Sequence, residues 1–351
     1  MVNQEPATAK TPTATQRRPA WPRIRSAWTR ARPVWTRARP AWMRGRSVWA
    51  RGRVLAVLAV GTAGLLALHR LVPGRMGSLL EAFLPWLGLV IVALLLAALL
   101  RRSATALVAL LLPVAAWAHL FGGLLLSAAE PGRRAVVVVQ HNVSDENTDP
   151  AGTARALAAA KPDLIALEEL VPAALPVYER TLASGFPYHA VHGTVGLWSK
   201  HPLTGVRPLD IKPRAITETW SRGLRAVVHT PHGDIAAYVA HLPSVRVRPS
   251  GLASAWRDES AVLLGRAVAA ERIGTVILLG DLNGTVDDRG LAPLTGRLNT
   301  AERGLAFTFP ASFPLARIDQ VMARRATVTR VRPLPATASD HLPLAAYLTL
   351  G

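Results

Sequence analysis

The stretch TVILLGDLN, residues 275–283, carries the pattern that decides the fold. Residues 276–279 are a short apolar run, and Gly280, Asp281 and Asn283 follow it directly. A run of this length, bounded by glycine and polar residues, is typical of a buried strand. A strand end is a rigid platform, so a polar side chain placed there is held in a defined position. The stretch therefore predicts a buried strand that presents Asp281 and Asn283 at its end.

Similar apolar runs lie on both sides of this strand in the sequence. Strands are predicted at RAVVVVQHN (134–142), DLIALEEL (163–170), TVGLWSK (194–200) and DIAAYVAHL (234–242), with two more inside 326–350. Helices are predicted at PAGTARALAAAKP (150–162) and over 254–274. Strands that alternate with helices indicate an α/β fold, and about 217 residues from 135 to 351 suffice for one large core.

Polar side chains close several of these strands or follow them in short loops. These are Asn142, Glu169, His241, Asp281, Asn283, Asp319 in ARIDQV, and the pair Asp340 and His341 in ASDHLP. In α/β folds such residues meet in a shared crevice. The chain has no cysteine, which excludes disulfides, thiolate metal sites and cysteine nucleophiles. An oxygen-rich site of this kind suits Mg²⁺ or Mn²⁺ better than zinc.

At these residues the sequence resembles the endonuclease/exonuclease/phosphatase superfamily, whose members have a DNase I-like fold. The motifs occur in the superfamily's order over residues 135–351: N-V, P-D-x-x-x-L-x-E, a strand-end His, G-D-x-N, I-D-x-V and S-D-H. The resemblance implies a four-layer α/β sandwich, with two packed sheets flanked by helices. It also implies metal-assisted hydrolysis of a phosphoric ester or anhydride.

The resemblance further implies a role for each matching position. Glu169 would be the principal metal ligand, with Asp340 and Asn142 close to the metal or its waters. Arg222 enters a strand beside the expected crevice, where it would clamp a phosphate; a structural salt bridge is the alternative. One departure from the family pattern is Glu168, which replaces the usual Gln before the metal-binding Glu.

The remaining implied roles concern the reacting phosphate. His341 would lie at the scissile phosphate, oriented and kept cationic or basic by Asp319, as in other carboxylate-held imidazoles. Asp281 would position or deprotonate the attacking water. Asn283 and His241 would donate hydrogen bonds to the phosphoryl oxygens as charge builds on them. By contrast, Asp287 and Asp288 follow NGT in a predicted loop, and we expect both to be solvated.

The N-terminal segment has a different composition. Five copies of W-x-R-x-R-x-x begin at Trp21, Trp28, Trp35, Trp42 and Trp49, and residues 1–53 hold thirteen basic residues against Glu5 alone. Most of the formal charge of +19 therefore belongs to this tail. We expect a disordered tail over 1–53 whose Trp and Arg side chains bind anionic lipid headgroups on the cytoplasmic leaflet.

Three apolar segments follow the tail, at about 54–72, 83–100 and 104–129. A membrane-spanning helix needs about 20 apolar residues, and the second and third segments meet this well. Three spans would form a multi-pass cell-membrane anchor with the N-terminus in the cytoplasm, a loop at 69–82 outside and the catalytic domain outside. Two spans would leave that domain inside, and a buried helical hairpin of a soluble protein is a further alternative.

This layout resembles the VanJ-type group of actinobacterial membrane proteins. That resemblance implies a phosphorylated lipid substrate such as undecaprenyl pyrophosphate, with a role in teicoplanin resistance. One alternative is an extracellular nuclease or phosphodiesterase acting on DNA or phospholipid. However, no basic and aromatic residues interleave near the motifs, so nucleic acid is not the expected partner. A non-enzymatic alternative is a membrane protein whose domain only binds phosphorylated ligands.

Overall fold

A computed structural model describes residues 52–126 and 135–351, all of which fall within one compact unit. Of the predicted tail, residues 1–53, only Gly52 and Arg53 are among the described residues. The five tryptophans of the Trp/Arg repeats lie outside them. Two β-sheets form the centre of the C-terminal part. The six-stranded sheet has the order β12-β13-β1-β2-β4-β3, and the five-stranded sheet has the order β11-β10-β7-β6-β5.

The strands of the six-stranded sheet come from both ends of the domain. They are β1 (Ala135–Asn142), β2 (Leu164–Glu168), β3 (Tyr188–His192), β4 (Val195–Ser199), β12 (Ala326–Pro333) and β13 (Leu344–Leu350). β1 lies between β2, to which it is parallel, and β13, to which it is antiparallel. Its four consecutive valines are what a strand with neighbours on both sides and layers on both faces requires.

The five-stranded sheet is built around β10, the strand predicted from TVILLGDLN. Its members are β5 (Leu203–Pro208), β6 (Gly223–Thr230), β7 (Gly233–Ala240), β10 (Thr275–Asp281) and β11 (Asp319–Arg324). β10 is parallel to β7 and antiparallel to β11. A separate hairpin is formed by β8 (Arg246–Arg248) and β9 (Gly251–Ala253).

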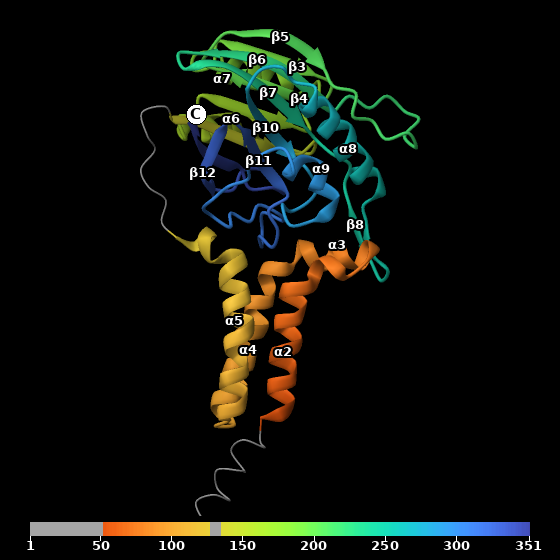
Figure 1. The fold of residues 1–351 in the computed structure, drawn as a ribbon. Coiled ribbons are helices and arrows are strands. Elements are labelled where there is room, and N and C mark those ends of the chain that lie inside the picture. Colours follow the sequence, from red (N-terminus) through yellow and green to blue (C-terminus); the bar gives the residue numbers. More distant parts are fainter. Residues whose placement is uncertain (1–51, 127–134) are drawn as a thin grey trace, which may run out of the picture. The chain divides into compact units, whose positions relative to one another are not determined.

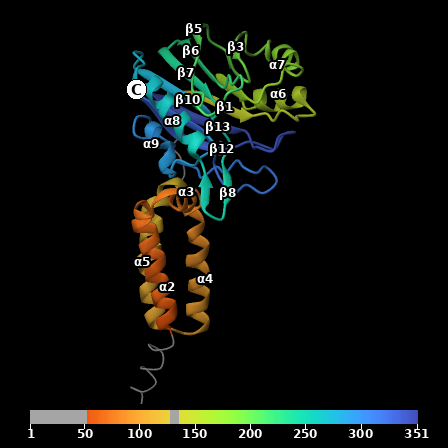
Figure 2. The same ribbon diagram turned by 90° about the vertical axis from the view of Figure 1, so that its right-hand side faces the viewer.

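The helices cover the two outer faces of the sheet pair. In Figure 2, α6 (Pro150–Ala159) and α7 (Leu175–Leu182) lie on one side, and α8 (Ala255–Ala269) and α9 (Ala292–Thr295) lie on the other. One apolar cluster fills the space between the sheets, with Val138 and Leu164 from one sheet and Ile277 from the other. Two further clusters lie under α6 and α7 and under α8 and α9. The predicted arrangement of two packed sheets flanked by helices is confirmed.

The sequence missed several short elements. β3 and β5 are strands at the edges of the two sheets, and their burial is incomplete. Incomplete burial removes the continuous apolar run by which the other strands were found. His189 and His192 belong to β3.

The N-terminal part of the described chain is helical (Figure 1). It consists of α2 (Arg53–Leu68), η1 (His69–Leu71), α3 (Gly74–Ala82), η2 (Leu84–Trp86), α4 (Leu87–Leu100) and α5 (Ala104–Leu125). Two helices, Arg53–Leu71 and Ala104–Leu125, are long and apolar enough to cross a membrane. A third candidate is the pair of segments Gly74–Ala82 and Leu84–Leu100, which is bent by 62°.

Two details of the predicted spans are corrected by these helices. The first apolar segment, expected to be the weakest, passes the length test because η1 continues it to Leu71. The second, expected to be strong, contains only the 14 residues of α4 as regular helix and qualifies only together with α3. The segment 69–82, predicted as a loop between the first two spans, contains η1 and α3.

Candidate active site

The polar residues predicted at strand ends meet at one edge of the two sheets. Asn142 ends β1, Glu169 follows β2, His241 follows β7 and Asp281 ends β10. β1 and β2 are parallel, as are β7 and β10, so each pair of carboxyl ends shares an edge. Asp319 begins β11 and pairs directly with Asp281, because an antiparallel strand starts where its neighbour ends.

His341 and Asp319 form a buried pair at the centre of this cluster. Nδ1 of His341 lies 2.9 Å from Oδ2 of Asp319, and Nε2 of His341 lies 3.8 Å from Oδ2 of Asp281. Burial acts to lower the pKa of His341, but the charges of Asp319 and Asp281 outweigh it and raise this pKa to about 10. Burial likewise acts to raise the pKa of Asp319, but the charge and hydrogen bond of His341 outweigh it and lower that pKa. The pair is therefore an imidazolium held by a carboxylate at neutral pH.

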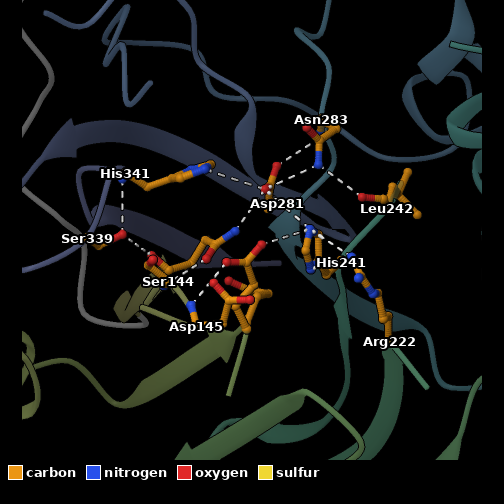
Figure 3. A network of polar contacts seen from close by, with 12 residues as sticks. Ser144, Asp145, Arg222, His241, Leu242, Asp281, Asn283, Ser339 and His341 are labelled. Atoms are coloured by element: carbon orange, nitrogen blue, oxygen red, sulfur yellow. Dashed lines mark hydrogen bonds and ion pairs between the residues drawn. The ribbon is translucent and has the colours of Figure 1, made fainter. Parts of the chain in front are cut away.

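Asp281 has the opposite electrostatic behaviour. Burial and the charge of Asp319 raise its pKa to about 7, with His341 opposing the shift. The backbone N–H of Asn283 donates to its Oδ1 at 2.9 Å, and Nδ2 of Asn142 donates to its Oδ2 at 3.2 Å. Figure 3 shows Asp281 in the middle of the network, with His341 and His241 on either side. A carboxyl group with a pKa near 7 can release and accept a proton at neutral pH.

His241 is a neutral imidazole between a carboxylate and a guanidinium. Its Nε2 lies 3.7 Å from both Glu169 Oε1 and Asp281 Oδ2, and Nη1 of Arg222 lies 3.3 Å from its Nδ1. Burial, then the charges of Arg222 and His341, lower its pKa to about 3. Among the described residues Arg222 has no ion pair within 4 Å, so the alternative of a structural salt bridge is not seen.

Asn283 lies where it was predicted, but its side chain is already engaged. Its Nδ2 donates to the carbonyl of Leu242 at 3.0 Å and to Asp281 at 3.3 Å (Figure 3). In this arrangement Asn283 positions Asp281. Its donation to a phosphoryl oxygen stays a prediction.

The three predicted metal ligands are not equally placed. The side chain of Glu169 is 29% exposed, and among the described residues its carboxylate accepts one hydrogen bond, from the Asp145 N–H at 3.3 Å, and lies 3.7 Å from Nε2 of His241. The Glu169 backbone has φ 58°, in the left-handed region, where a non-glycine residue is uncommon. Asn142 lies beside Asp281, whereas the exposed side chain of Asp340 stands outside that hydrogen-bond network.

A second group of possible ligands is formed by Asp281, Asp319 and His341, whose oxygen and nitrogen atoms lie within 4.8 Å of one another. A metal ion bound by this group would first have to displace the proton that the raised pKa of His341 holds on its imidazole. The oxygen donors around Glu169 therefore fit a hard cation better than this group does.

Two buried residues lie behind the cluster: Gln140, which was not expected from the sequence, and Glu168, which was noted only as a departure from the family pattern. Nε2 of Gln140 donates to Oε2 of Glu168 at 2.8 Å and to Oδ1 of Asp319 at 3.0 Å. Burial, then the charges of Asp319 and Asp281, raise the pKa of Glu168 well above its usual value. A protonated Glu168 has nearly the shape of the Gln that usually stands there. The available signal was Gln140 itself, a polar residue inside an otherwise apolar strand.

The prediction that Asp288 is solvated is wrong. Asp288 is buried, and its Oδ2 lies 2.6 Å from Nη2 of the fully buried Arg257. Nη1 of Arg257 donates to the carbonyl of Asn283 at 3.0 Å. A buried guanidinium needs a carboxylate partner, which explains why this loop acid turns inward. The pair supports the loop that carries Asn283.

Comparisons with known proteins were made for sequence and for structure. The model of the Endonuclease/Exonuclease/phosphatase family matches residues 139–341. Comparison with curated proteins gives no match. An endonuclease/exonuclease/phosphatase from Beutenbergia cavernae DSM 12333 is similar, with 22% identity and a TM-score of 0.52 over 62% of this chain and 72% of that chain.

D. rerio TDP2 complexed with a single-strand DNA product is also similar. It is 17% identical, with a TM-score of 0.51 over 61% of this chain and 98% of that chain. At these identities the two solved structures show a shared fold.

Proposed function

The chain belongs to the Endonuclease/Exonuclease/phosphatase family, and we propose on this premise that it is a membrane-anchored, metal-dependent phosphohydrolase acting on a phosphorylated lipid. The observation that carries the proposal is the buried His341–Asp319 pair facing Asp281. It supplies a cationic group and a basic group on either side of one crevice, which hydrolysis of a phosphoric ester or anhydride requires.

The residues of the crevice divide the chemistry between them. Asp281, ionised near neutral pH, accepts a proton from the attacking water. The imidazolium of His341 stabilises the charge that builds on the phosphoryl oxygens and protonates the leaving oxygen. Asp319 holds that imidazolium in position, and neutral His241 with Arg222 provides further hydrogen-bond donors.

Glu169 is the residue best placed to hold Mg²⁺ or Mn²⁺, with Asn142 beside it and Asp340 at the rim. Such a cation supplies Lewis-acid polarisation of the phosphate when bound. The partly exposed carboxylate of Glu169 is consistent with this role, because it has no strong partner of its own among the described residues.

A lipid substrate is supported by an apolar groove of about 500 Å³ between the helices and the catalytic domain. It is lined by residues of η2, α4 and α5, including Trp86 and Trp117, and by Leu305 and Phe307 of the domain. The ring of Trp86 stacks on Phe307 at 5.3 Å, and Phe309, two residues further on, packs against His341 at 4.8 Å. A hydrocarbon chain in this groove would hold its headgroup near the catalytic histidine.

We propose that the groove and crevice act together on a polyprenyl diphosphate such as undecaprenyl pyrophosphate. In this proposal, three spans place the N-terminus in the cytoplasm and the catalytic domain outside, where this lipid carrier is recycled. The VanJ-type resemblance and a part in glycopeptide resistance belong to the same proposal. The N-terminal Trp/Arg tail would hold the protein on anionic lipid headgroups.

The test is hydrolysis by the purified full chain in detergent micelles. With Mg²⁺ or Mn²⁺, we expect release of phosphate from undecaprenyl pyrophosphate. We expect loss of this activity with EDTA, and its return when the cation is restored. His341→Ala should lower kcat by at least about 10³-fold. His232→Ala, in the exposed turn between β6 and β7, is the matched control and should leave kcat unchanged.

The rival function is hydrolysis of DNA, for which the similar TDP2 structure contains a DNA product. If the wild-type chain nicked plasmid DNA and left the lipid intact, and His341→Ala abolished the nicking, the lipid proposal would be replaced by a nuclease function.

A further inference from the structure

A second pocket, which the chemistry above does not use, lies beside the active site. Its volume is about 680 Å³. Four arginines and two tryptophans give it its character: Arg75, Arg222, Arg246, Arg248, Trp220 and Trp256. Glu218 is the one acid among its lining residues. We call this the basic pocket.

The arginines of the basic pocket are not neutralised by the protein. Within residues 52–126 and 135–351, the guanidinium groups of Arg75, Arg246 and Arg248 have no hydrogen bond or ion pair to another residue. By contrast, the buried Arg225 of this domain is paired with a carboxylate, Oε2 of Glu271, at 2.9 Å. Like charges gathered without partners repel one another, so their position favours an anionic ligand.

Arg222 joins the basic pocket to the active site. It lines the pocket, and its Nη1 lies 3.3 Å from Nδ1 of His241. In Figure 3 its guanidinium points toward His241. Pro243 and Ser244, which also line the pocket, follow His241 closely along the chain. A group bound in the pocket is therefore separated from the reacting phosphate by little more than one side chain.

Arg75 reaches the pocket from α3, and two contacts hold this helix on the domain. The buried carboxylate of Glu81 accepts from Nη2 of Arg289 at 2.8 Å and from its Nε at 2.9 Å. Gly251, at the start of β9, lies so close to Arg75 that a Cβ there would be 2.3 Å from the Arg75 carbonyl carbon. The basic pocket is thus assembled from the helical part of the chain and the β8–β9 hairpin together.

We infer that the basic pocket binds a second phosphate group of the lipid substrate, adjacent to the phosphate that is attacked. This inference rests on the proposed phosphohydrolase function. It implies that the protein binds diphosphate lipids more tightly than monophosphate lipids. Guanidinium groups bind phosphate oxygens through paired N–H donors, and the pocket offers three arginines besides Arg222 for a phosphate next to the one that is attacked. The Trp256 side chain, 51% exposed, and Trp220 offer apolar rims that suit a lipid-borne headgroup.

The test measures binding in the full chain carrying His341→Ala, so that bound lipid is not turned over. The probes are undecaprenyl pyrophosphate, undecaprenyl phosphate and inorganic pyrophosphate, with the lipids in identical detergent micelles. The double change Arg246→Gln and Arg248→Gln should weaken binding of the diphosphate lipid at least about tenfold and that of the monophosphate lipid less than about threefold. Arg75→Gln should also weaken binding of the diphosphate lipid more than that of the monophosphate lipid. Arg180→Gln, on the exposed face of α7, is the control and should leave both affinities unchanged.

Equal loss of affinity for both lipids would overturn the inference, because the pocket would then not distinguish a second phosphate. Loss of inorganic pyrophosphate binding alone, with both lipids unaffected, would also overturn it and leave a site for a free anion. The proposed function is judged separately by turnover in the wild-type chain. Arginine-dependent preference for the diphosphate lipid without any hydrolysis would support the pocket and reject the phosphohydrolase.

Discussion

His341 is stabilised in its charged form by two carboxylates that are themselves buried. Its pKa of about 10, against 6.5 for an ordinary histidine, means that the native state holds this proton more tightly than the unfolded chain does. The stability from the His341–Asp319 pair is therefore fully present below pH 6.5, and it is lost as pH rises through about 10. Catalysis that needs the imidazolium has the same upper limit.

We predict that Asp319→Asn moves this upper limit to lower pH. Without the Asp319 charge, the burial that lowers the His341 pKa is less strongly opposed, so the basic limb of the kcat/KM profile should fall from near 10 toward neutrality. At pH 8 we expect activity to drop by about 10²- to 10⁴-fold. The measurement is a pH–rate profile on a lipid diphosphate. A basic limb that stays in place would show that His341 does not carry it.

Asp288 shows how one loop acid can support the site from behind. Changing Asp288 to Asn leaves the buried Arg257 without its 2.6 Å partner. We expect a loss of about 2 kcal/mol in the free energy of unfolding, since a buried hydrogen bond to a charged group is lost, while Asp258 Oδ1, 2.7 Å from Nε of Arg257, still compensates part of the charge. Thermal and chemical unfolding of the full chain would measure it. Asp210→Asn, at an exposed position, should cost less than about 0.5 kcal/mol.

At the scale of elements, the contact between α3 and the β8–β9 hairpin decides whether the basic pocket is complete. Gly251 allows the contact in two ways: it has φ +103°, and its lack of a Cβ leaves room for the Arg75 backbone. Glu81 and Arg289 fix the other side of α3. A helix that carries one arginine of a site must be held by contacts outside that site.

We predict that Gly251→Ala separates α3 from the hairpin. The new methyl group would meet backbone atoms, which cannot move as a flexible side chain can. Amide hydrogen exchange should rise across α3, and diphosphate lipid binding should weaken. Gly233→Ala is the matched control, because Gly233 also has a positive φ of +113° but no atom within 4 Å of the added Cβ. If Gly251→Ala and Gly233→Ala raised the amide exchange of α3 equally, the positive φ that both positions share, and not the steric clash at Gly251, would be the cause.

At the scale of the whole molecule, the number of spans determines the side on which the catalytic domain lies. Two helices meet the requirement alone, and the bent pair formed by α3 and α4 makes a third if it crosses as one unit. An odd number of spans places the N-terminus and the catalytic domain on opposite sides of the membrane, and an even number places them on the same side.

The natural absence of cysteine makes this testable by single substitutions. We predict that Arg180→Cys, on α7, reacts with an impermeant maleimide in intact cells, whereas Arg101→Cys, in the turn between α4 and α5, reacts only after the membrane is opened. Labelling of position 180 only in opened cells would place the domain in the cytoplasm and remove the argument for a lipid carrier outside. Hydrolysis by the purified protein would be unaffected by that result.

The buried strands and the polar residues at their ends could be predicted from the sequence alone. Residues 275–283 and 134–142 could be recognised because central strands are apolar without interruption, and Asp281 and Asn142 because they end such runs. The family motifs then implied the two-sheet architecture, which the structure confirms. These features are local, so they can be read along the chain.

Features that depend on residues far apart in the chain could not be predicted before the fold was known. The 2.9 Å contact of His341 with Asp319, the protonation that follows from it, and the inward turn of Asp288 toward Arg257 all require side chains that the fold brings together. The same holds for the basic pocket, where Arg75 meets Arg246 and Arg248 across some 170 residues of sequence. Charge and burial act through space, and the sequence specifies spatial neighbours only through the completed fold.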